Sequence, residues 1–182
     1  MVLKQLTIEN KQYIKEAAEL LREAFPHSYF DSADEEILTC LQEEKVVIGA
    51  IENNKLVGFV GAIPQYNVTA WELHPLIVSA FHRLKGIGRQ LCIELEKILR
   101  SKGCLTIYLG SDDETGSTTL GNTNLFEDTF EKIKNIKNIQ KHPFEFYQKM
   151  GYQIVGVIPD ANGIGKPDIW MAKSITEHTN NL

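Results

Sequence analysis

Apolar side chains return every three or four positions in several stretches of the chain, which is the period of an amphipathic α-helix. The pattern predicts long helices over residues 11–25 and 87–103 and shorter ones over 32–44 and 144–151. A further helix is predicted over 124–139, and its inward side chains are expected to be Leu125, Phe126, Phe130, Ile133 and Ile136. Five segments therefore carry the helical period.

Other stretches alternate with the two-residue period of a strand or are short and continuously apolar. They predict strands over 45–52, 55–66, 71–78, 104–110, 152–159 and 168–175. Asn53 and Asn54 join the first two as a hairpin. Pro75 interrupts the third, where a residue without an N–H predicts a bulge or a broken ladder. Helices alternate with strands through the middle, so the predicted class is α/β (α+β) with a mixed sheet.

Composition indicates the size of the domain and the cellular compartment of the protein. With 182 residues, 43% of them hydrophobic and 24% charged, the chain is expected to form a single domain over 1–182. No apolar run is long enough to span a membrane and the N-terminus lacks a signal-peptide core, so a cytoplasmic protein is expected. The three widely spaced cysteines favour reduced, buried thiols.

The net charge of -5 narrows the class of partner. It argues against nucleic acid and is compatible with a cationic small molecule or another protein. The histidines and cysteines show no metal-ligand spacing, so no metal is expected.

A glycine-containing segment, Arg83-Leu84-Lys85-Gly86-Ile87-Gly88, lies between a predicted strand and a long predicted helix. The third glycine of a dinucleotide fingerprint is missing after Gly88, and the other candidate, "DANGIGKP", fails as a P-loop because Pro167 follows Lys166. Glycines at a helix N-terminus allow backbone amides to approach an anion such as a pyrophosphate. A plain tight turn with solvated Arg83 and Lys85 is the alternative that these residues leave open.

Several segments together resemble a known family. The R-x-x-G-x-G loop and the later "FYQKMGYQIVG" resemble the GNAT superfamily of acyl-CoA-dependent N-acetyltransferases. The segments "AIPQY", "WELHPL", "TIYLGSDD", "HPFEFYQKMGYQIVGVIPDANG" and "KPDIWMAK" are similar, in order and spacing, to one group of aminoglycoside 6'-N-acetyltransferases. Enzymes of this group often lack one glycine of this loop. The present chain has that glycine, so its loop matches the complete loop motif of the superfamily.

The resemblance implies a bent mixed sheet flanked by helices, with strands 71–78 and 104–110 splayed apart around acetyl-CoA. By the family pattern, the backbone of Leu76, Ile77 and Val78 pairs with the pantetheine arm. The pyrophosphate is held by Arg83, Leu84, Lys85, Gly86, Ile87 and Gly88. Tyr147 matches the family's tyrosine near the coenzyme A sulfur, although an aromatic residue in an amphipathic helix is more often part of a core. The resemblance also implies a homodimer, for which the apolar strand 168–175 offers a possible edge.

The expected reaction is direct attack of an amine on the acetyl thioester in a ternary complex, and it needs a proton acceptor and a polarised carbonyl. Glu72 and His74 share one strand face, so either could accept the ammonium proton, and Glu72 is preferred. His74 could also be a structural side chain beside a proline. The amide of Leu76, just beyond Pro75, is the expected oxyanion donor.

An aminoglycoside carries several ammonium groups, so its pocket is expected to be acidic with aromatic walls. The candidates are Glu72, Asp112, Phe25 and Tyr66, with Tyr29 and Asp113 as further members. Asp112 and Asp113 could instead organise an ordinary loop. The alternative acceptors are a polyamine, a peptide or a protein amine, and a binding domain without chemistry is the alternative class.

Overall fold

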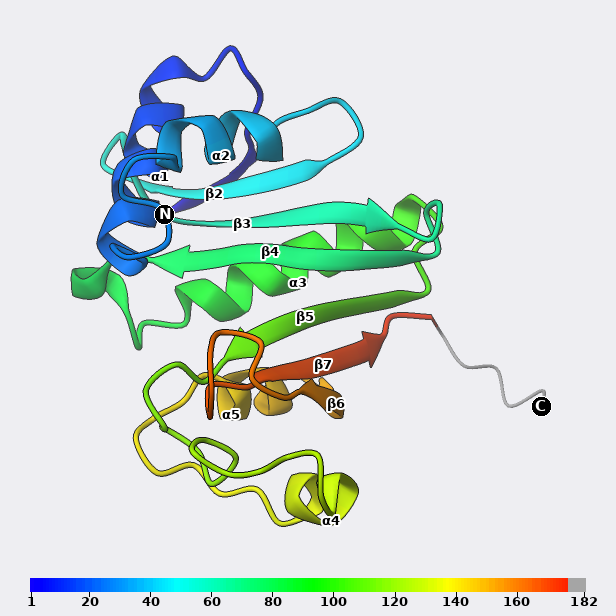
Figure 1. Cartoon of the computed structure of the whole chain (residues 1–182). Coiled ribbons are helices and arrows are strands. Elements are labelled where there is room, and N and C mark those ends of the chain that lie inside the picture. The colour runs from blue at the N-terminus through cyan, green and yellow to red at the C-terminus, as the bar shows by residue number, and fades with distance from the viewer. Residues whose placement is uncertain (177–182) are drawn as a thin grey trace. The chain divides into compact units, whose positions relative to one another are not determined.

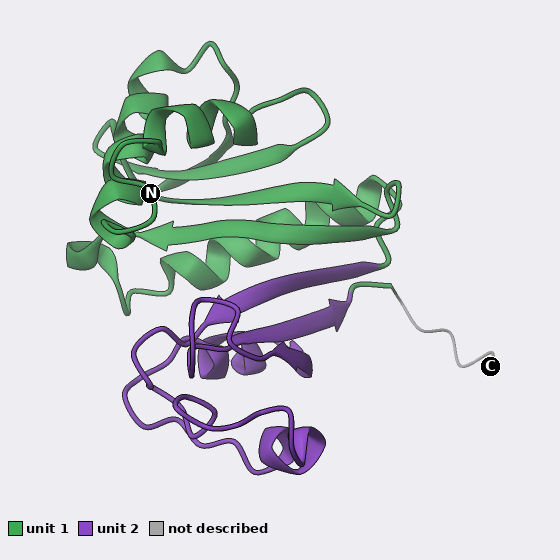
Figure 2. Ribbon diagram, in the orientation of Figure 1, with its two compact units in different colours: residues 1–105, 175–182 green, residues 106–174 purple. Residues whose placement is uncertain are grey.

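The computed structural model describes residues 1–176, and most of its elements are labelled in Figure 1. The chain divides into two compact units, which Figure 2 colours separately. Unit 1 comprises residues 1–105 with the segment that begins at 175, and unit 2 comprises residues 106–174.

Unit 1 contains an antiparallel sheet in the order β1-β2-β3-β4. Its strands are β1 (Val2–Gln5), β2 (Val46–Glu52), β3 (Lys55–Gln65) and β4 (Ala70–Val78). Its helices are α1 (Lys11–Ala24), α2 (Ala33–Cys40), the short 3-10 helix η1 (Ala80–His82) and α3 (Ile87–Ser101). The two-residue turn between β2 and β3 is made by Asn53 and Asn54, both with positive φ, as the hairpin prediction requires.

Helices cover both faces of this sheet (Figure 1). On one face α1 and α2 pack over β3 and β4, and their apolar stripes form one core with Val47, Phe59 and Ile77 of the strands. On the other face α3 contacts β2, β3 and β4 and buries one apolar stripe: Ile87, Leu91, Cys92, Leu95 and Leu99. The sheet of unit 1 thus contains β4, and α3, which packs on it, holds the glycine loop at its N-terminus.

Unit 2 contains a three-stranded antiparallel sheet in the order β5-β7-β6. Its strands are β5 (Thr106–Asp112), β6 (Gln153–Ile158) and β7 (Asp168–Ser174). Its helices are α4 (Thr129–Lys134) and α5 (Phe144–Lys149). Because β7 pairs with a strand on each side, the expectation that it offers a free edge is wrong.

Most predicted elements are confirmed, and the class is α/β as expected. Two features differ. The sequence pattern missed β1, a short strand with mostly exposed side chains. The helix predicted over 124–139 is only six residues long, and Phe126 and Phe130 are 73% and 83% exposed instead of inward. The single domain over 1–182 and the splayed strands concern both units and stay predictions; residues 177–182 of that range lie outside the described part.

The irregularity predicted at Pro75 is present in β4. Val60 pairs with Leu76 and Ala62 pairs with Leu73, so His74 and Pro75 together oppose the single residue Gly61. Two residues facing one is the arrangement of a β-bulge, and bulges redirect the side chains and amides that follow them. The prediction from the missing proline N–H is therefore confirmed.

Candidate active site

The glycine loop lies between η1 and the N-terminus of α3. Leu84 and Gly86 both have positive φ, of 61° and 81°, so two of three consecutive residues are in the left-handed region of backbone conformation. A Cβ placed on Gly86 would meet nothing within 4 Å, so this glycine is needed for its backbone conformation and the space around it is open. The loop is exposed, and only Ile87 turns inward, where it joins the core stripe of α3.

The amides of this loop are available to an anion. Gln90 is the first residue here whose N–H donates into the helix, to the carbonyl of Gly86. Within residues 1–176, no protein oxygen accepts a hydrogen bond from the amides of residues 84–89. Amides directed out of a helix N-terminus carry partial positive charge. The loop therefore fits a phosphate or pyrophosphate group.

Arg83 anchors the start of the loop. Its Nε donates to the carbonyl of Val78 at 3.1 Å, which fixes the loop against the end of β4. The remaining guanidinium N–H groups are exposed beside the loop. Arg83 can thus contribute both the position of the loop and positive charge.

The register of β4 decides which main-chain groups a ligand could reach. Ser79 donates to Val57, so the pair Gly58–Val78 between them does not exchange hydrogen bonds. Bonded and non-bonded pairs alternate, so Ile77 exchanges its bonds with Phe59, and the Val60–Leu76 pair again does not. The N–H and C=O groups of Leu76 and Val78 therefore point away from β3, whereas those of Ile77 point toward it.

Glu72 and His74 lie on one face of β4, because their half-buried side chains alternate with the buried Trp71 and Leu73. This is the face covered by α1 and α2. The His74 Nε2 atom lies 3.5 Å from the hydroxyl of Tyr29 and 3.5 Å from Oε1 of Glu36. The face thus combines two carboxylates, an imidazole and a phenol.

Sequence reasoning missed Glu36. Its carboxylate also accepts a hydrogen bond from the thiol of Cys40 at 3.6 Å. Burial, the charge of Glu36 and this hydrogen bond raise the pKa of Cys40 to about 12. A signal was present, because Glu36 lies on the stripe of α2 that buries Ala33, Ile37 and Cys40, where a charged residue is unusual.

Of the aromatic residues expected to line a pocket, Phe25 lies beside this face. It ends α1, and its ring meets that of Tyr29 edge to face with centroids 6.2 Å apart. Tyr29 in turn reaches His74. The structure therefore connects Phe25 to the Glu72 face through Tyr29.

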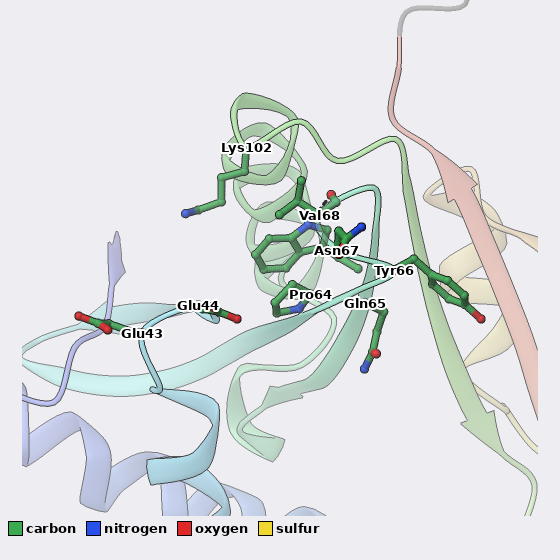
Figure 3. A pocket seen from close by; sticks show the side chains of 9 residues that line it. Glu43, Glu44, Pro64, Gln65, Tyr66, Asn67, Val68 and Lys102 are labelled. Atoms are coloured by element: carbon green, nitrogen blue, oxygen red, sulfur yellow. Dashed lines mark hydrogen bonds between the residues drawn. The ribbon is translucent and has the colours of Figure 1, made fainter.

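Tyr66 lies elsewhere, in the turn between β3 and β4, where it is 79% exposed. It lines a hollow of about 740 Å³ on unit 1 together with Trp71, Lys102 and the two glutamates Glu43 and Glu44 (Figure 3). Neither Glu72 nor His74 lines this hollow. Trp71 is fixed there by its indole N–H, which donates to the carbonyl of Val68.

Unit 2 holds the other predicted residues. Tyr147 on α5 is half-buried and packs edge to face against Phe146 and Tyr152, with ring centroids 5.1 and 5.7 Å away. Asp112 ends β5 with an exposed carboxylate that accepts a hydrogen bond from the amide of Asn162.

Asp113, the next residue, has a different role. It is 1% exposed, and its carboxylate accepts bonds from the amides of Ser117 and Thr118 and from the Thr118 hydroxyl. Asp113 organises its own loop, which is the alternative that the sequence left open.

No group of three or more histidines, cysteines, aspartates and glutamates in the described part of the chain could hold a metal ion. No helix among residues 1–176 is long and apolar enough to cross a membrane.

A glycine turn with outward amides before a long helix and a bulged strand with outward main-chain groups define an α/β fold that fits an extended ligand containing phosphate. Comparison with protein families agrees, because the model described as the acetyltransferase (GNAT) family matches residues 14–130. The chain belongs to the GNAT acetyltransferase family.

Comparison with solved structures shows which members of the family this chain resembles. The chain is 47% identical to an aminoglycoside 6'-N-acetyltransferase complexed with coenzyme A, with a TM-score of 0.96 over 98% of this chain and 99% of that one. It is 46% identical to the aminoglycoside 6'-N-acetyltransferase of Enterococcus faecium, with a TM-score of 0.93 and the same coverage. An aminoglycoside 6'-acetyltransferase type Ii is 39% identical over the same shares, with a TM-score of 0.78. A comparison with curated proteins gives no match.

Proposed function

We propose that the protein transfers the acetyl group of acetyl-CoA to the 6'-amine of aminoglycosides, by direct attack within a ternary complex. The observation that carries this proposal is identity of 47% and 46%, over nearly the whole chain, to two aminoglycoside 6'-N-acetyltransferases. More distant acetyltransferases, such as the ribosomal-protein-S18-alanine enzyme of Escherichia coli, are only 18% identical and support the fold alone.

The residues of unit 1 fit coenzyme A. The outward amides of the loop from Leu84 to Gly88 bind its pyrophosphate, and Arg83 adds positive charge. The main-chain groups of Leu76 and Val78, which point away from β3, pair with the pantetheine arm. The backbone of Ile77 was expected to pair with the arm as well, but its main-chain groups are directed to Phe59 and its side chain packs in the core beneath α1 and α2. Acetyl-CoA supplies the activated acetyl group when it is bound.

The proton transfers are assigned to residues on β4 and α5. Glu72 or His74 removes a proton from the ammonium group of the acceptor, directly or through a water molecule. The amide of Leu76 donates to the carbonyl oxygen that gains charge during attack. The phenol of Tyr147 donates a proton to the departing thiolate of coenzyme A.

The acceptor binds where acidic and aromatic groups meet. Glu72 binds an ammonium group, and Phe25, whose ring packs against Tyr29, is proposed as an aromatic wall. Asp112 at the end of β5 and Tyr66 in the turn between β3 and β4 are proposed as further acidic and aromatic contacts, from outside the Glu72 face. We further propose a homodimer in the cytoplasm, where acetyl-CoA is available; the three cysteines are buried and form no disulfide, which supports a reducing compartment.

Release of free thiol from acetyl-CoA in the presence of different amines tests the proposal. The expected result is turnover with kanamycin-type substrates that carry a 6'-amine, and none with analogues that have a 6'-hydroxyl in its place. Faster turnover of spermidine or a lysine-rich peptide than of every aminoglycoside would contradict the proposed substrate. The assignment as an acetyltransferase would still stand.

Two variants separate catalysis from mere binding. Glu72→Ala and Tyr147→Phe are each expected to lower kcat by roughly 100-fold, because each removes a proton-transfer group. Unchanged turnover in both variants would contradict the assigned roles.

The homodimer has a separate test. A single mass equal to the monomer in sedimentation at micromolar concentration would contradict it.

A further inference from the structure

Glu36 is a partly buried carboxylate that the mechanism above does not use. Its side chain is 26% exposed, and that of His74, which it faces, is 32% exposed. Oε1 of Glu36 lies 3.5 Å from Nε2 of His74, and the same oxygen accepts the thiol hydrogen of Cys40. Glu36 thus connects the first turns of α2 to the face of β4 that carries Glu72.

The chemistry of these groups selects one form of the imidazole. A carboxylate only accepts hydrogen bonds, so a ring nitrogen that forms a hydrogen bond with it must carry a proton. A neutral His74 with a proton on Nε2 has its lone pair on Nδ1. Any hydrogen bond that the ring accepts from a substrate amine or from water must then be accepted by Nδ1.

Tyr29 is the competing partner on the same atom. Its hydroxyl lies 3.5 Å from Nε2 of His74 and can either donate or accept. If it donated, Nε2 would have to carry the lone pair and Nδ1 the proton. The charge of Glu36 favours the opposite form, because a carboxylate is a stronger acceptor of an N–H than a hydroxyl is.

Cys40 is a second donor to the same carboxylate oxygen. Burial raises the pKa of its thiol, so the sulfur keeps its proton at neutral pH and remains a donor to Glu36. The Glu36 carboxylate therefore receives a donor from its own helix and has capacity for the N–H of His74. The groups that face His74 are then Tyr29 from the segment between α1 and α2, Glu36 from α2, and Glu72 from the same strand face.

We propose that Glu36 is a positioning residue that holds His74 with its proton on Nε2, so that, when His74 rather than Glu72 takes the ammonium proton of the acceptor, Nδ1 is the accepting atom. In that step an N–H bond of the ammonium group breaks and an Nδ1–H bond forms. The resulting imidazolium keeps its Nε2–H on Glu36 and returns the new proton to solvent. The catalytic part rests on the proposed function, and the tautomer does not.

Nitrogen-15 NMR of the histidine rings tests the tautomer directly. Long-range proton–nitrogen spectra of the full chain show which ring nitrogen carries hydrogen, and His74→Asn identifies the His74 signals among the five histidines. At a pH where the ring is neutral, the Nε2–H form is expected to dominate in the wild type. Glu36→Ala should raise the Nδ1–H fraction several-fold, and Glu36→Gln, whose amide oxygen also accepts, should restore the wild-type form.

Glu35→Ala is the matched control, because Glu35 lies on the same turn of α2 with an exposed side chain. It should leave the tautomer of His74 unchanged. A wild-type ring that is mainly Nδ1–H, or a ring that Glu36→Ala does not change, would overturn the proposal.

Kinetics test the consequence. With a 6'-amino aminoglycoside, Glu36→Ala should lower kcat roughly tenfold and leave the KM for acetyl-CoA within twofold, since positioning a base affects proton transfer. In the His74→Asn background the same change should have no further effect on kcat, because its effect passes through His74. An equal loss in both backgrounds would overturn the positioning role. If the wild type acetylates no aminoglycoside, the proposed function fails, and the ring tautomer still decides the role of Glu36.

Discussion

Gly61 and the carbonyl oxygen of His74 face each other so closely that a Cβ on Gly61 would lie 2.2 Å from that oxygen. This contact is where the bulge of β4 meets β3. A side chain at Gly61 would force the bulge outward, and Leu76 would move with it. We expect Gly61→Ala to lower the free energy of unfolding by about 1–3 kcal/mol. It should also lower kcat/KM by about tenfold or more, because the Leu76 amide would be displaced.

Chemical denaturation and steady-state kinetics measure these two effects. Gly156→Ala is the control, since Gly156 also lies in a bulged strand but a Cβ there meets nothing within 4 Å. That variant should change the free energy of unfolding by no more than about 0.5 kcal/mol. Equal stability of the Gly61 and Gly156 variants would show that the bulge tolerates a side chain.

The loop before α3 should bind acetyl-CoA mainly through its backbone. A β-branched residue at Gly86 cannot hold a φ of 81° without strain, so Gly86→Val should redirect the amides that follow it. We expect Gly86→Val to raise the Kd for acetyl-CoA by at least about tenfold, as strain of 1–3 kcal/mol allows. Arg83→Ala should raise it less. Calorimetric titration with coenzyme A measures both.

Gly103 offers a control at the other end of the same helix. It has a φ of 83°, and a Cβ there also meets nothing within 4 Å. Gly103→Val should therefore cost similar stability and leave coenzyme A binding unchanged. A weaker effect of Gly86→Val than of Arg83→Ala would assign the binding to the side chain instead.

The sequence predicted those features that depend on local chemistry. The bulge at Pro75 could be predicted because proline lacks an N–H, and the face shared by Glu72 and His74 follows from the two-residue period of a strand. The six-residue helix α4 could not be predicted in the same way. Its apolar residues have helical spacing, yet Asp128, just before the helix, has a positive φ, and the rings of Phe126 and Phe130 face solvent.

Features that depend on tertiary contacts could not be predicted from the sequence. Nothing local pairs Glu36 with His74, because the two residues meet only when α2 packs over the sheet. Asp112 and Asp113 are adjacent and chemically identical in sequence. Only the fold turns one carboxylate outward and the other toward Ser117 and Thr118.

The thiol of Cys40 should make stability depend on pH in the alkaline range. Burial, then the charge of Glu36 and its hydrogen bond raise the folded pKa of this thiol from 9.0 to about 12. Because the folded state holds the proton more tightly, its contribution is complete below about pH 9 and is lost as pH rises toward about 12. The difference in unfolding free energy between wild type and Cys40→Ala should be constant from about pH 6 to about pH 8 and shrink above it. A difference that stays constant up to about pH 11 would contradict the raised pKa.

Substitution of Asp113 should lower stability, whereas substitution of Asp112 should weaken substrate binding. Asp113→Asn places an amide where two backbone N–H groups and a hydroxyl donate to a buried carboxylate, so it should lower the free energy of unfolding by about 3 kcal/mol. The KM of the remaining folded enzyme for an aminoglycoside should not change. Asp112→Asn should change stability by less than about 1 kcal/mol, because its carboxylate is exposed, and should raise that KM. Thermal unfolding and aminoglycoside kinetics on both variants measure the contrast, and a raised KM in Asp113→Asn alone would reverse the two assignments.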